Sequence, residues 1–427
     1  MPPVREVEVV IIGAGPTGIG AAVRAQELGL DWVLVEAASR PGGMAVSVTD
    51  DRGFTWDLGG HVLHSHFDCF DKAIANAGVE FVYPVRNGWV QTGGQLKRTP
   101  IQQHLSELPT DLRPEAPAPD LATYFTNQFG RTLADEFFIP FQYKMWATPL
   151  TEVDHTWTSL RSGSAERNVP QIGGAPTPQA TVFPYPRGGN GRLWDAIAAT
   201  LPQERIHYGS AVTAIDAGTK TVTLSTGTTI DYQHVVSSMA LPTLLSMLGM
   251  PIQPNLSANE VFIVGLGFNG EPPPTLADKS WLYNPDLQVA WHRATMLSNY
   301  DPDNAGPGRW NILFEVGRSP QRRVSDHDAL ASCRTSVEAL GADLTQLDST
   351  WTRTVPMGYP VPTLGRDEVL ADHDRRLKSL DIRSRGRFGG WRYESCNQDY
   401  SFAQGVEAID SIDTGRPEDV LWHPERF

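Results

Sequence analysis

The densest group of side chains that could do chemistry lies near the C-terminus, in the run GRFGGWRYESCNQDYSFAQGVEA at residues 386–408. Arginine, tyrosine, asparagine and glutamine alternate there with glycine and aromatic residues. Buried polar groups need hydrogen-bond partners, so an ordinary core does not hold them at this density. The run is therefore interpreted as part of a ligand-binding site.

A second group of such residues is the glycine motif GAGPTGIG, in which Gly13, Gly15 and Gly18 have the spacing of a dinucleotide-binding turn. These glycines allow a tight turn, the close approach of a pyrophosphate and tight packing of a helix on a strand. The amide groups at the start of that helix would point at the phosphates. The motif predicts a dinucleotide cofactor.

The elements that must position this motif follow from its flanks. An apolar run at residues 6–12 predicts a buried strand, residues 16–28 predict a helix that stops at Gly29, and residues 32–35 predict a second strand. That strand ends at Glu36, where a carboxylate can accept hydrogen bonds from a ribose. A merely solvated glutamate is the alternative interpretation.

The sequence after Glu36 distinguishes FAD from NAD. Arg40, Gly42 and Gly43 follow within a few residues, and DLGGH occupies residues 57–61. This continuation resembles the two-dinucleotide FAD folds, which include amine oxidases and mutases. The resemblance implies FAD, with Gly59, Gly60 and His61 close to it.

Composition limits the function classes. A chain of 427 residues exceeds the usual size of one core, so two or three lobes are expected. The net charge of −14 disfavours nucleic acid as a partner, because that affinity rests on clustered Lys and Arg. The oligomeric state is not indicated.

The cysteines and the apolar runs indicate the compartment. Cys69, Cys333 and Cys396 form no CxxC pair, so neither a disulfide framework nor a zinc cage is predicted. We find no charged-then-apolar leader and no run of 18 apolar residues, which argues against secretion and membrane spanning. The expected setting is reducing and cytoplasmic.

Composition shifts along the chain predict a discontinuous α/β architecture. A proline-rich segment at residues 108–120 marks a boundary, and the apolar spacing up to Trp146 predicts a helical lobe. The segment from Arg187 predicts a glycine turn and a helix, and residues 211–237 predict a small sheet flanking FAD. Strand-like runs at about 260–355 predict an antiparallel substrate sheet. The expected units are a Rossmann-like FAD-binding domain of the two-dinucleotide type (1–95, 185–250 and 356–427), a helical lobe (96–150) and the substrate domain (151–184 and 251–355).

Six segments together resemble the UDP-galactopyranose mutases, in their eukaryotic-type branch. They are DLGGHV, KMWATP, PRGGNG, the stretch from SWLY to WHRAT, GYPVPTL and the C-terminal run. Their order is that of the family, and the resemblance covers nearly the whole chain. It implies an isomerase that interconverts the pyranose and furanose forms of a sugar nucleotide.

The resemblance also assigns residues to the substrate. Arg161 and Arg293 correspond to two arginines that clamp the pyrophosphate, and arginine suits that task because its fork stays charged and bonds bidentately. Tyr283, Tyr359 and Tyr393 correspond to tyrosines that approach the pyrophosphate. The other positions matched to the substrate are Gln102, Gln142, Trp146, Gln179 and Asn397.

The cofactor assignments complete the expected site. Arg387 and Gln398 match the segment that closes over flavin and substrate, and Val212 is assigned to the cofactor side. His61 corresponds to a histidine on the flavin ring, while His66 and Arg86 match positions near the flavin. His61, His64 and His66 could in principle bind a metal, but no supporting Cys or acid stands at ligand spacing, so no metal is expected.

The family's reaction implies no net redox change. Reduced FAD attacks the anomeric carbon, the nucleoside diphosphate leaves, and a covalent sugar–flavin adduct opens and recloses as a furanose. A hydride donor such as NAD(P)H must first reduce the flavin. The protein's task is then to orient the sugar and hold the diphosphate.

The chain departs from the family at the positions that contact uracil. The family has YPFQ where this chain has Thr99, Pro100, Ile101 and Gln102, and asparagine where it has Gln142. Two aromatic stacking surfaces are lost, which makes room for a larger base. The base is therefore expected to be that of UDP or of GDP, with a GDP-hexose such as GDP-galactose as one possible substrate.

Two other function classes stay open. An FAD-dependent amine oxidase or desaturase would share the glycine motif and DLGG, but it would need no arginine clamp. A non-catalytic flavin and nucleotide-sugar sensor would keep the binding residues without turnover. The hexose itself is not indicated by the sequence.

Overall fold

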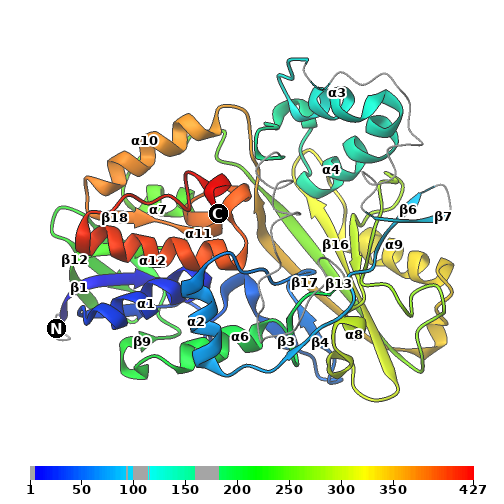
Figure 1. Ribbon diagram of the computed structural model, residues 1–427, viewed down its shortest axis with the longest axis horizontal. Helices are drawn as coiled ribbons and strands as arrows, with labels where there is room; N and C mark the ends of the chain where they lie inside the picture. The colour runs from blue at the N-terminus through cyan, green and yellow to red at the C-terminus, as the bar shows by residue number, and fades with distance from the viewer. Residues whose placement is uncertain (1–4, 93–94, 100–113, 115, 159–181) are drawn as a thin grey trace.

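A sheet with a parallel centre forms one half of the molecule, as the N-terminal strand pattern predicts. The computed structural model describes residues 5–92, 95–99, 114, 116–158 and 182–427. Strand β1 (Arg5–Ile12) pairs in parallel with β2 (Trp32–Val35) and β12 (Thr229–Ser237). Strands β9 (Ile206–His207) and β18 (Ile382–Ser384) extend this sheet. The sheet therefore combines both ends of the chain with its middle (Figure 1).

The helix predicted at residues 16–28 is confirmed as α1 (Pro16–Leu28), which ends at Gly29 in the left-handed conformation. Helix α12 (Gln398–Thr414) lies against it (Figure 1). The two backbones nearly touch, because a Cβ atom on Gly405 would lie 2.0 Å from the carbonyl oxygen of Thr17. This contact holds the first residues of α12 beside the glycine motif.

The antiparallel sheet expected at about 260–355 is also found. Its long strands are β13 (Ala258–Asn269), β16 (Arg309–Arg318) and β17 (Leu347–Pro360), and β14 (Trp281–Tyr283) and β15 (Arg293–Thr295) continue it. Helix α9 (Asp326–Ala339) packs on β13, over a core that includes Phe262 and Trp310.

Two details of the predicted organisation are wrong. Strands β6 (Gly88–Thr92) and β7 (Gln95–Arg98) pair with β14 in the second sheet, although residues up to 95 were expected in the FAD-binding unit. Strands β10 (Val212–Asp216) and β11 (Thr221–Leu224) form no separate sheet, because β12 pairs with β11 on one edge and with β1 on the other.

The predicted helical lobe consists of α3 (Leu121–Leu133), a π-helical turn (Ala134–Phe138) and α4 (Ile139–Trp146). Its aromatic residues form a core that includes Phe125, Phe138 and Trp146, and Tyr393 of the C-terminal run packs into the same core. The lobe stands above the second sheet in Figure 1. It therefore contacts the C-terminal run directly.

The remaining elements connect these units. The helices are α2 (Asp68–Ala77), α6 (Gly191–Ala199), α7 (Leu241–Met247), α8 (Leu297–Tyr300), α10 (Arg366–Lys378) and α11 (Gly386–Gly389). Two further antiparallel pairs are β3 (Ser47–Thr49) with β4 (Thr55–Asp57), which are close in sequence, and β5 (Phe81–Val82) with β8 (Tyr185–Pro186), which are distant in sequence. In the described ranges, no helix combines the length and the apolar character needed to cross a bilayer.

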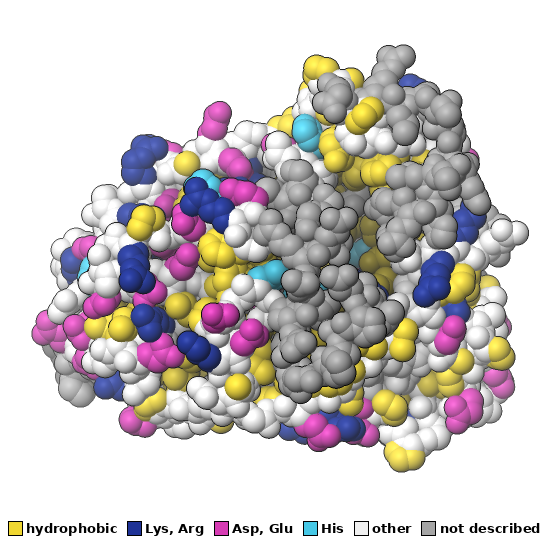
Figure 2. Space-filling model, in the orientation of Figure 1, with side chains coloured by type: hydrophobic (Ala, Val, Ile, Leu, Met, Phe, Trp, Pro, Cys, Tyr) yellow, Lys and Arg dark blue, Asp and Glu magenta, His cyan; other side chains and the backbone are white. Residues whose placement is uncertain are grey.

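On the face seen in Figure 2, positive and negative side chains are interspersed over the α/β unit. The three cysteines are free thiols. No group of three or more His, Cys, Asp or Glu side chains among the described residues is arranged to hold a metal ion.

The contact between α1 and α12 generates a test of the fold. Gly405→Ala should lower the free energy of unfolding by about 1–3 kcal/mol, because the new methyl group collides with the Thr17 carbonyl. The displaced helix should also weaken retention of FAD. Chemical denaturation and the FAD content after gel filtration measure the two effects. Asp413→Ala, at an exposed position of the same helix, is the control and should change stability by less than about 0.5 kcal/mol.

Candidate functional site

The cavity that the glycine motif lines, here called the main cavity, has a volume of about 480 Å³ and lies between the two sheets. Its lining begins at the turn between β1 and α1, follows the end of β2, and reaches β15, β16 and the C-terminal run. A cavity of this size, with a few convergent polar groups, is typical of a small-molecule site.

The glycine motif forms one end of the main cavity. Gly15 precedes α1 as its N-cap and has no side-chain cap, so the amide groups of the first helical turn face outward without an internal acceptor. Gly43 approaches the same turn so closely that a Cβ atom on it would lie 3.2 Å from the Cα of Gly15. The space beside these two backbones suits a pyrophosphate.

Glu36 lies in the lining at the end of β2, as the sequence predicts. Its carboxylate accepts hydrogen bonds from the backbone N–H groups of Ala14 at 2.6 Å and Ala38 at 2.7 Å. These bonds fix the carboxylate beside the glycine turn. Each oxygen keeps a further lone pair that can accept a ribose hydroxyl.

The loop of Gly59, Gly60 and His61 lies at the middle of the cavity. A Cβ atom on Gly60 would lie 2.4 Å from the Thr295 hydroxyl, so only glycine fits there. Burial, together with the charges of Arg387 and Arg293, lowers the pKa of His61 to about 3. His61 is therefore neutral at pH 7, and its Nδ1 has no partner among the described residues.

Arg293 and Glu315 form a bidentate ion pair in the lining. Nε and Nη2 of Arg293 donate to the two oxygens of Glu315 at 2.6 and 2.8 Å, and the N–H of Gly60 donates to the same carboxylate at 3.0 Å. Burial alone raises the pKa of Glu315, but the Arg293 charge and hydrogen bonds outweigh it and lower the pKa to about 2. Both groups are therefore charged at neutral pH.

Sequence reasoning missed Glu315. The residue stands alone in the apolar run NILFEVGR of β16, and its side chain is 2% exposed. A single acid inside a strand that is otherwise apolar could have indicated a buried ion pair. Its pairing with Arg293 was not predictable, because Arg293 lies on another strand, β15.

Aromatic and amide side chains complete the lining around Arg387. The Arg387 guanidinium lies 5.2 Å from the centre of the Tyr359 ring, and the rings of Tyr359 and Tyr393 lie 5.7 Å apart. Burial raises the pKa of Tyr359 to about 12, although Arg293 opposes the shift. The phenol therefore keeps its proton at neutral pH. Asn397 lies in the same lining.

The remaining predicted residues fall into three groups. Val212 and Gln398 also line the cavity, and the side-chain oxygen of Gln398 accepts from Trp194 Nε1 at 2.7 Å. Outside the lining, among the described residues, lie Gly18, Arg40, Gly42, Gln142, Trp146 and Tyr283. Arg161, Gln102 and Gln179 lie outside the described residues.

Of the residues outside the lining, Trp146 and Tyr283 contact lining residues, whereas Arg40 lies apart from the cavity. Trp146 packs edge-on against Tyr393, with 4.6 Å between the ring centres, and Tyr283 is paired with Arg293 across strands β14 and β15. Arg40 instead donates to the carbonyl of Ser47 at 3.0 Å and to Asp195 at 2.6 Å. Arg40 therefore does not reach the cavity in this arrangement.

The lining fits FAD. The capless helix start and Glu36 suit its pyrophosphate and ribose, and the Gly59–Gly60–His61 loop offers a flat backbone surface with an unpartnered His61 nitrogen. The Nε of Arg387 is likewise buried and unpartnered among the described residues. Arg293 and Arg387 leave the inner part of the cavity suited to an anion beside the cofactor.

Comparison with known proteins agrees with this geometry. A family model described as flavin containing amine oxidoreductase matches residues 16–390. A curated ferredoxin–NADP reductase of Ralstonia nicotianae is 35% identical over 89 residues, which are 21% of this chain and 24% of that protein. The match thus spans only about a quarter of the curated relative.

Two solved structures resemble the whole chain. The crystal structure of a reduced UDP-galactopyranose mutase is 34% identical, covers 98% of both chains and superposes with a TM-score of 0.87. Cyclohexylamine oxidase from Brevibacterium oxydans is 15% identical, covers 96% of this chain and all of its own, and has a TM-score of 0.69, which shows the fold alone. The chain belongs to the flavin-containing amine oxidoreductase family and, within it, to the UDP-galactopyranose mutases, which are isomerases.

Proposed function

We propose that the protein interconverts the pyranose and furanose forms of a nucleoside-diphosphate hexose, with UDP-galactose or a GDP-hexose such as GDP-galactose as substrate. One observation carries the proposal: Arg293, Arg387, Tyr359 and Tyr393 line the same cavity as the predicted FAD-binding motif. Cations and phenols at this place suit a diphosphate held against the flavin.

Bound FAD, in its reduced state, supplies the nucleophile and carries the proton of this reaction. An external hydride donor such as NAD(P)H belongs to the proposal as the source of that state. The residues of this chain bind and orient the sugar nucleotide, so that its anomeric carbon lies next to the cofactor. The proposed setting is the cytoplasm.

The Arg293–Glu315 pair has a defined role in this scheme. Glu315 neutralises most of the Arg293 charge, so the pair exerts little net attraction on a phosphate. Its proposed contribution is instead the fixed direction of the remaining N–H groups of Arg293, which would orient the phosphate. Arg387 then provides net positive charge in the lining, and Arg161 is proposed to add a second cation. The neutral His61 and the protonated Tyr359 bring no charge that would oppose the diphosphate.

Product analysis tests the activity directly. The oxidised and the dithionite-reduced holoenzyme should be incubated with UDP-galactose and with a panel of GDP-hexoses, and the products separated by anion-exchange chromatography. Furanose isomers formed only by the reduced enzyme are expected. Oxygen consumption with an amine would instead indicate the oxidase class, and binding without any isomer would indicate a sensor.

The clamp is tested by a pair of variants. Arg293→Ala should weaken nucleotide binding more than tenfold, and it should also destabilise the fold by about 3–5 kcal/mol because Glu315 is left buried and unpaired. The double variant Arg293→Ala/Glu315→Gln should recover most of the stability and none of the affinity. Calorimetric titration with UDP and GDP and denaturant unfolding separate the two effects. Unchanged affinity in both variants contradicts the assignment.

The base preference is tested at Thr99, which follows β7 and donates its N–H to the carbonyl of Gly88 at 2.9 Å. Thr99→Tyr restores a stacking surface worth about 1–3 kcal/mol, so the ratio of UDP affinity to GDP affinity should rise about tenfold. Arg98→Tyr, on the opposite face of the strand, is the control. A ratio that Thr99→Tyr leaves unaltered counts against this pocket.

A further inference from the structure

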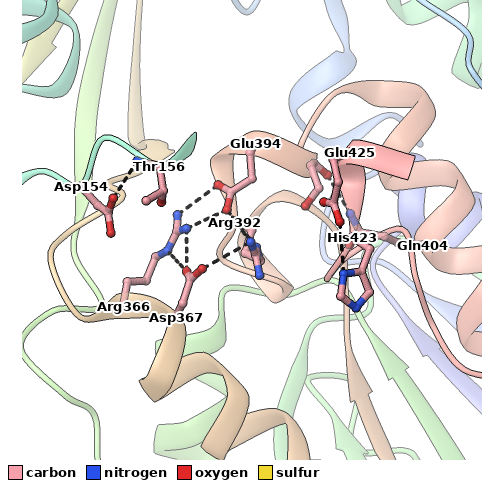
Figure 3. A network of polar contacts seen from close by, with 10 residues as sticks. Asp154, Thr156, Arg366, Asp367, Arg392, Glu394, Gln404, His423 and Glu425 are labelled. Carbon is pink, nitrogen blue, oxygen red and sulfur yellow. Dashed lines mark hydrogen bonds and ion pairs between the residues drawn. The ribbon is translucent and has the colours of Figure 1, made fainter. Parts of the chain in front are cut away.

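The C-terminal run is held in place by a buried charge network that lies outside the cavity lining. Glu394 follows Tyr393 directly, and its side chain is 1% exposed. Nη1 and Nη2 of Arg366 donate to its two oxygens at 3.2 and 2.7 Å, and Nε of Arg392 donates to it at 2.9 Å (Figure 3). One carboxylate thus joins the first residue of α10 to the run that carries Tyr393.

The charges of this network balance. Burial raises the pKa of Glu394, but the charges of Arg366 and Arg392 outweigh it and lower the pKa below its usual value. Asp367 neutralises the second cation, since its carboxylate lies 2.7 Å from Nη2 of Arg366 and 3.3 Å from Nη2 of Arg392. The two carboxylates therefore balance the charges of the two guanidinium groups.

The backbone of the same run is bent and needs external support. Trp391 has a positive φ of 56°, which costs free energy for a bulky residue, and its side chain is fully buried. Gln404 of α12 accepts from the N–H of Gly386 at 2.8 Å and donates to the carbonyl of Ser395 at 2.7 Å. Gln404 thereby ties Gly386 to Ser395. These two residues are the ends of the bent segment that carries Arg387 and Tyr393.

The network also reaches the helical lobe. The residues just before α10 bond to the segment that follows the lobe, through Asp154 N–H to Pro362 O at 2.7 Å and Leu364 N–H to Glu152 O at 3.1 Å. That segment carries Trp157, whose ring lies 5.2 Å from that of Tyr393. The lobe, α10 and the C-terminal run consequently share one anchoring point.

We propose that Glu394 is a positioning residue: held by Arg366 and Arg392, it fixes the run from Tyr393 to Asn397 so that these two side chains meet the diphosphate of the sugar nucleotide. The inference rests on the proposed function for the identity of the ligand. Glu394 itself does not line the cavity and touches no reacting atom.

The test compares two buried carboxylates of equal exposure in the FAD-loaded protein. Glu394→Gln should raise KM for the sugar nucleotide at least tenfold while kcat falls less than threefold. Glu418→Gln is the matched control, because Glu418 is also 1% exposed and paired with a buried arginine, Arg385, and no hydrogen bond or ion pair described for either residue goes to residues 393–397. It should lower the unfolding temperature similarly and leave KM within twofold.

A milder variant keeps the inference testable if Glu394→Gln does not fold. Arg392→Lys keeps the charge but loses the fork, and it should raise KM by an intermediate factor. Equal KM changes for Glu394→Gln and Glu418→Gln, or a Glu394→Gln enzyme with unchanged KM, overturn the inference.

Failure of the proposed function is recognised separately, by a wild-type holoenzyme that forms no furanose from any sugar tested. The positioning inference is then decided on the visible absorption of the bound flavin. A spectrum shifted in Glu394→Gln and unshifted in Glu418→Gln supports it, and identical spectra overturn it.

Discussion

The close approach of α12 to α1 is the constraint on which the site depends. Glycine at position 405 lets the two helix backbones come so near that any side chain there would strike the Thr17 carbonyl. The start of α12, with Asn397 and Gln398, is thereby brought beside the glycine turn. The glycine motif from one end of the chain and the C-terminal run from the other thereby become a single cavity lining.

A second constraint is the cost of burying charge. Each buried guanidinium group near the cavity is met by a carboxylate or an aromatic face: Arg293 by Glu315, Arg366 by Glu394 and Arg387 by Tyr359. An unpaired charge in such surroundings is strongly destabilising. The ion pairs thus hold the arginine forks in fixed directions, as the proposed diphosphate ligand would require.

Local patterns predicted the parts of the fold that local chemistry determines. The helix at residues 16–28, the strands around it and the antiparallel substrate sheet are found as expected, and the FAD-type fold is confirmed. The pairing of β6 and β7 with β14 was not predicted, because period and turn residues do not encode which distant strand is the neighbour. Glu315 was missed for the same reason, since its partner Arg293 lies on another strand. Trp146 and Tyr283 carry the expected residue types, yet the structure uses them to support Tyr393 and Arg293 rather than to line the cavity.

The order of strands in the first sheet has a consequence for biosynthesis. Strand β1 is made first, but its neighbour β12 ends at Ser237, β18 begins only at Ile382, and α12 follows last. Chains fold from the N-terminus during synthesis as domains become complete, and here the first sheet and its partner helix are both present only once Thr414 has been added. The glycine motif is therefore synthesised long before its partner helix α12. The second sheet, whose last strand β17 ends at Pro360, can form before α12 is made. A chain truncated before α12 therefore lacks the residues of this helix that line the cavity together with the glycine motif.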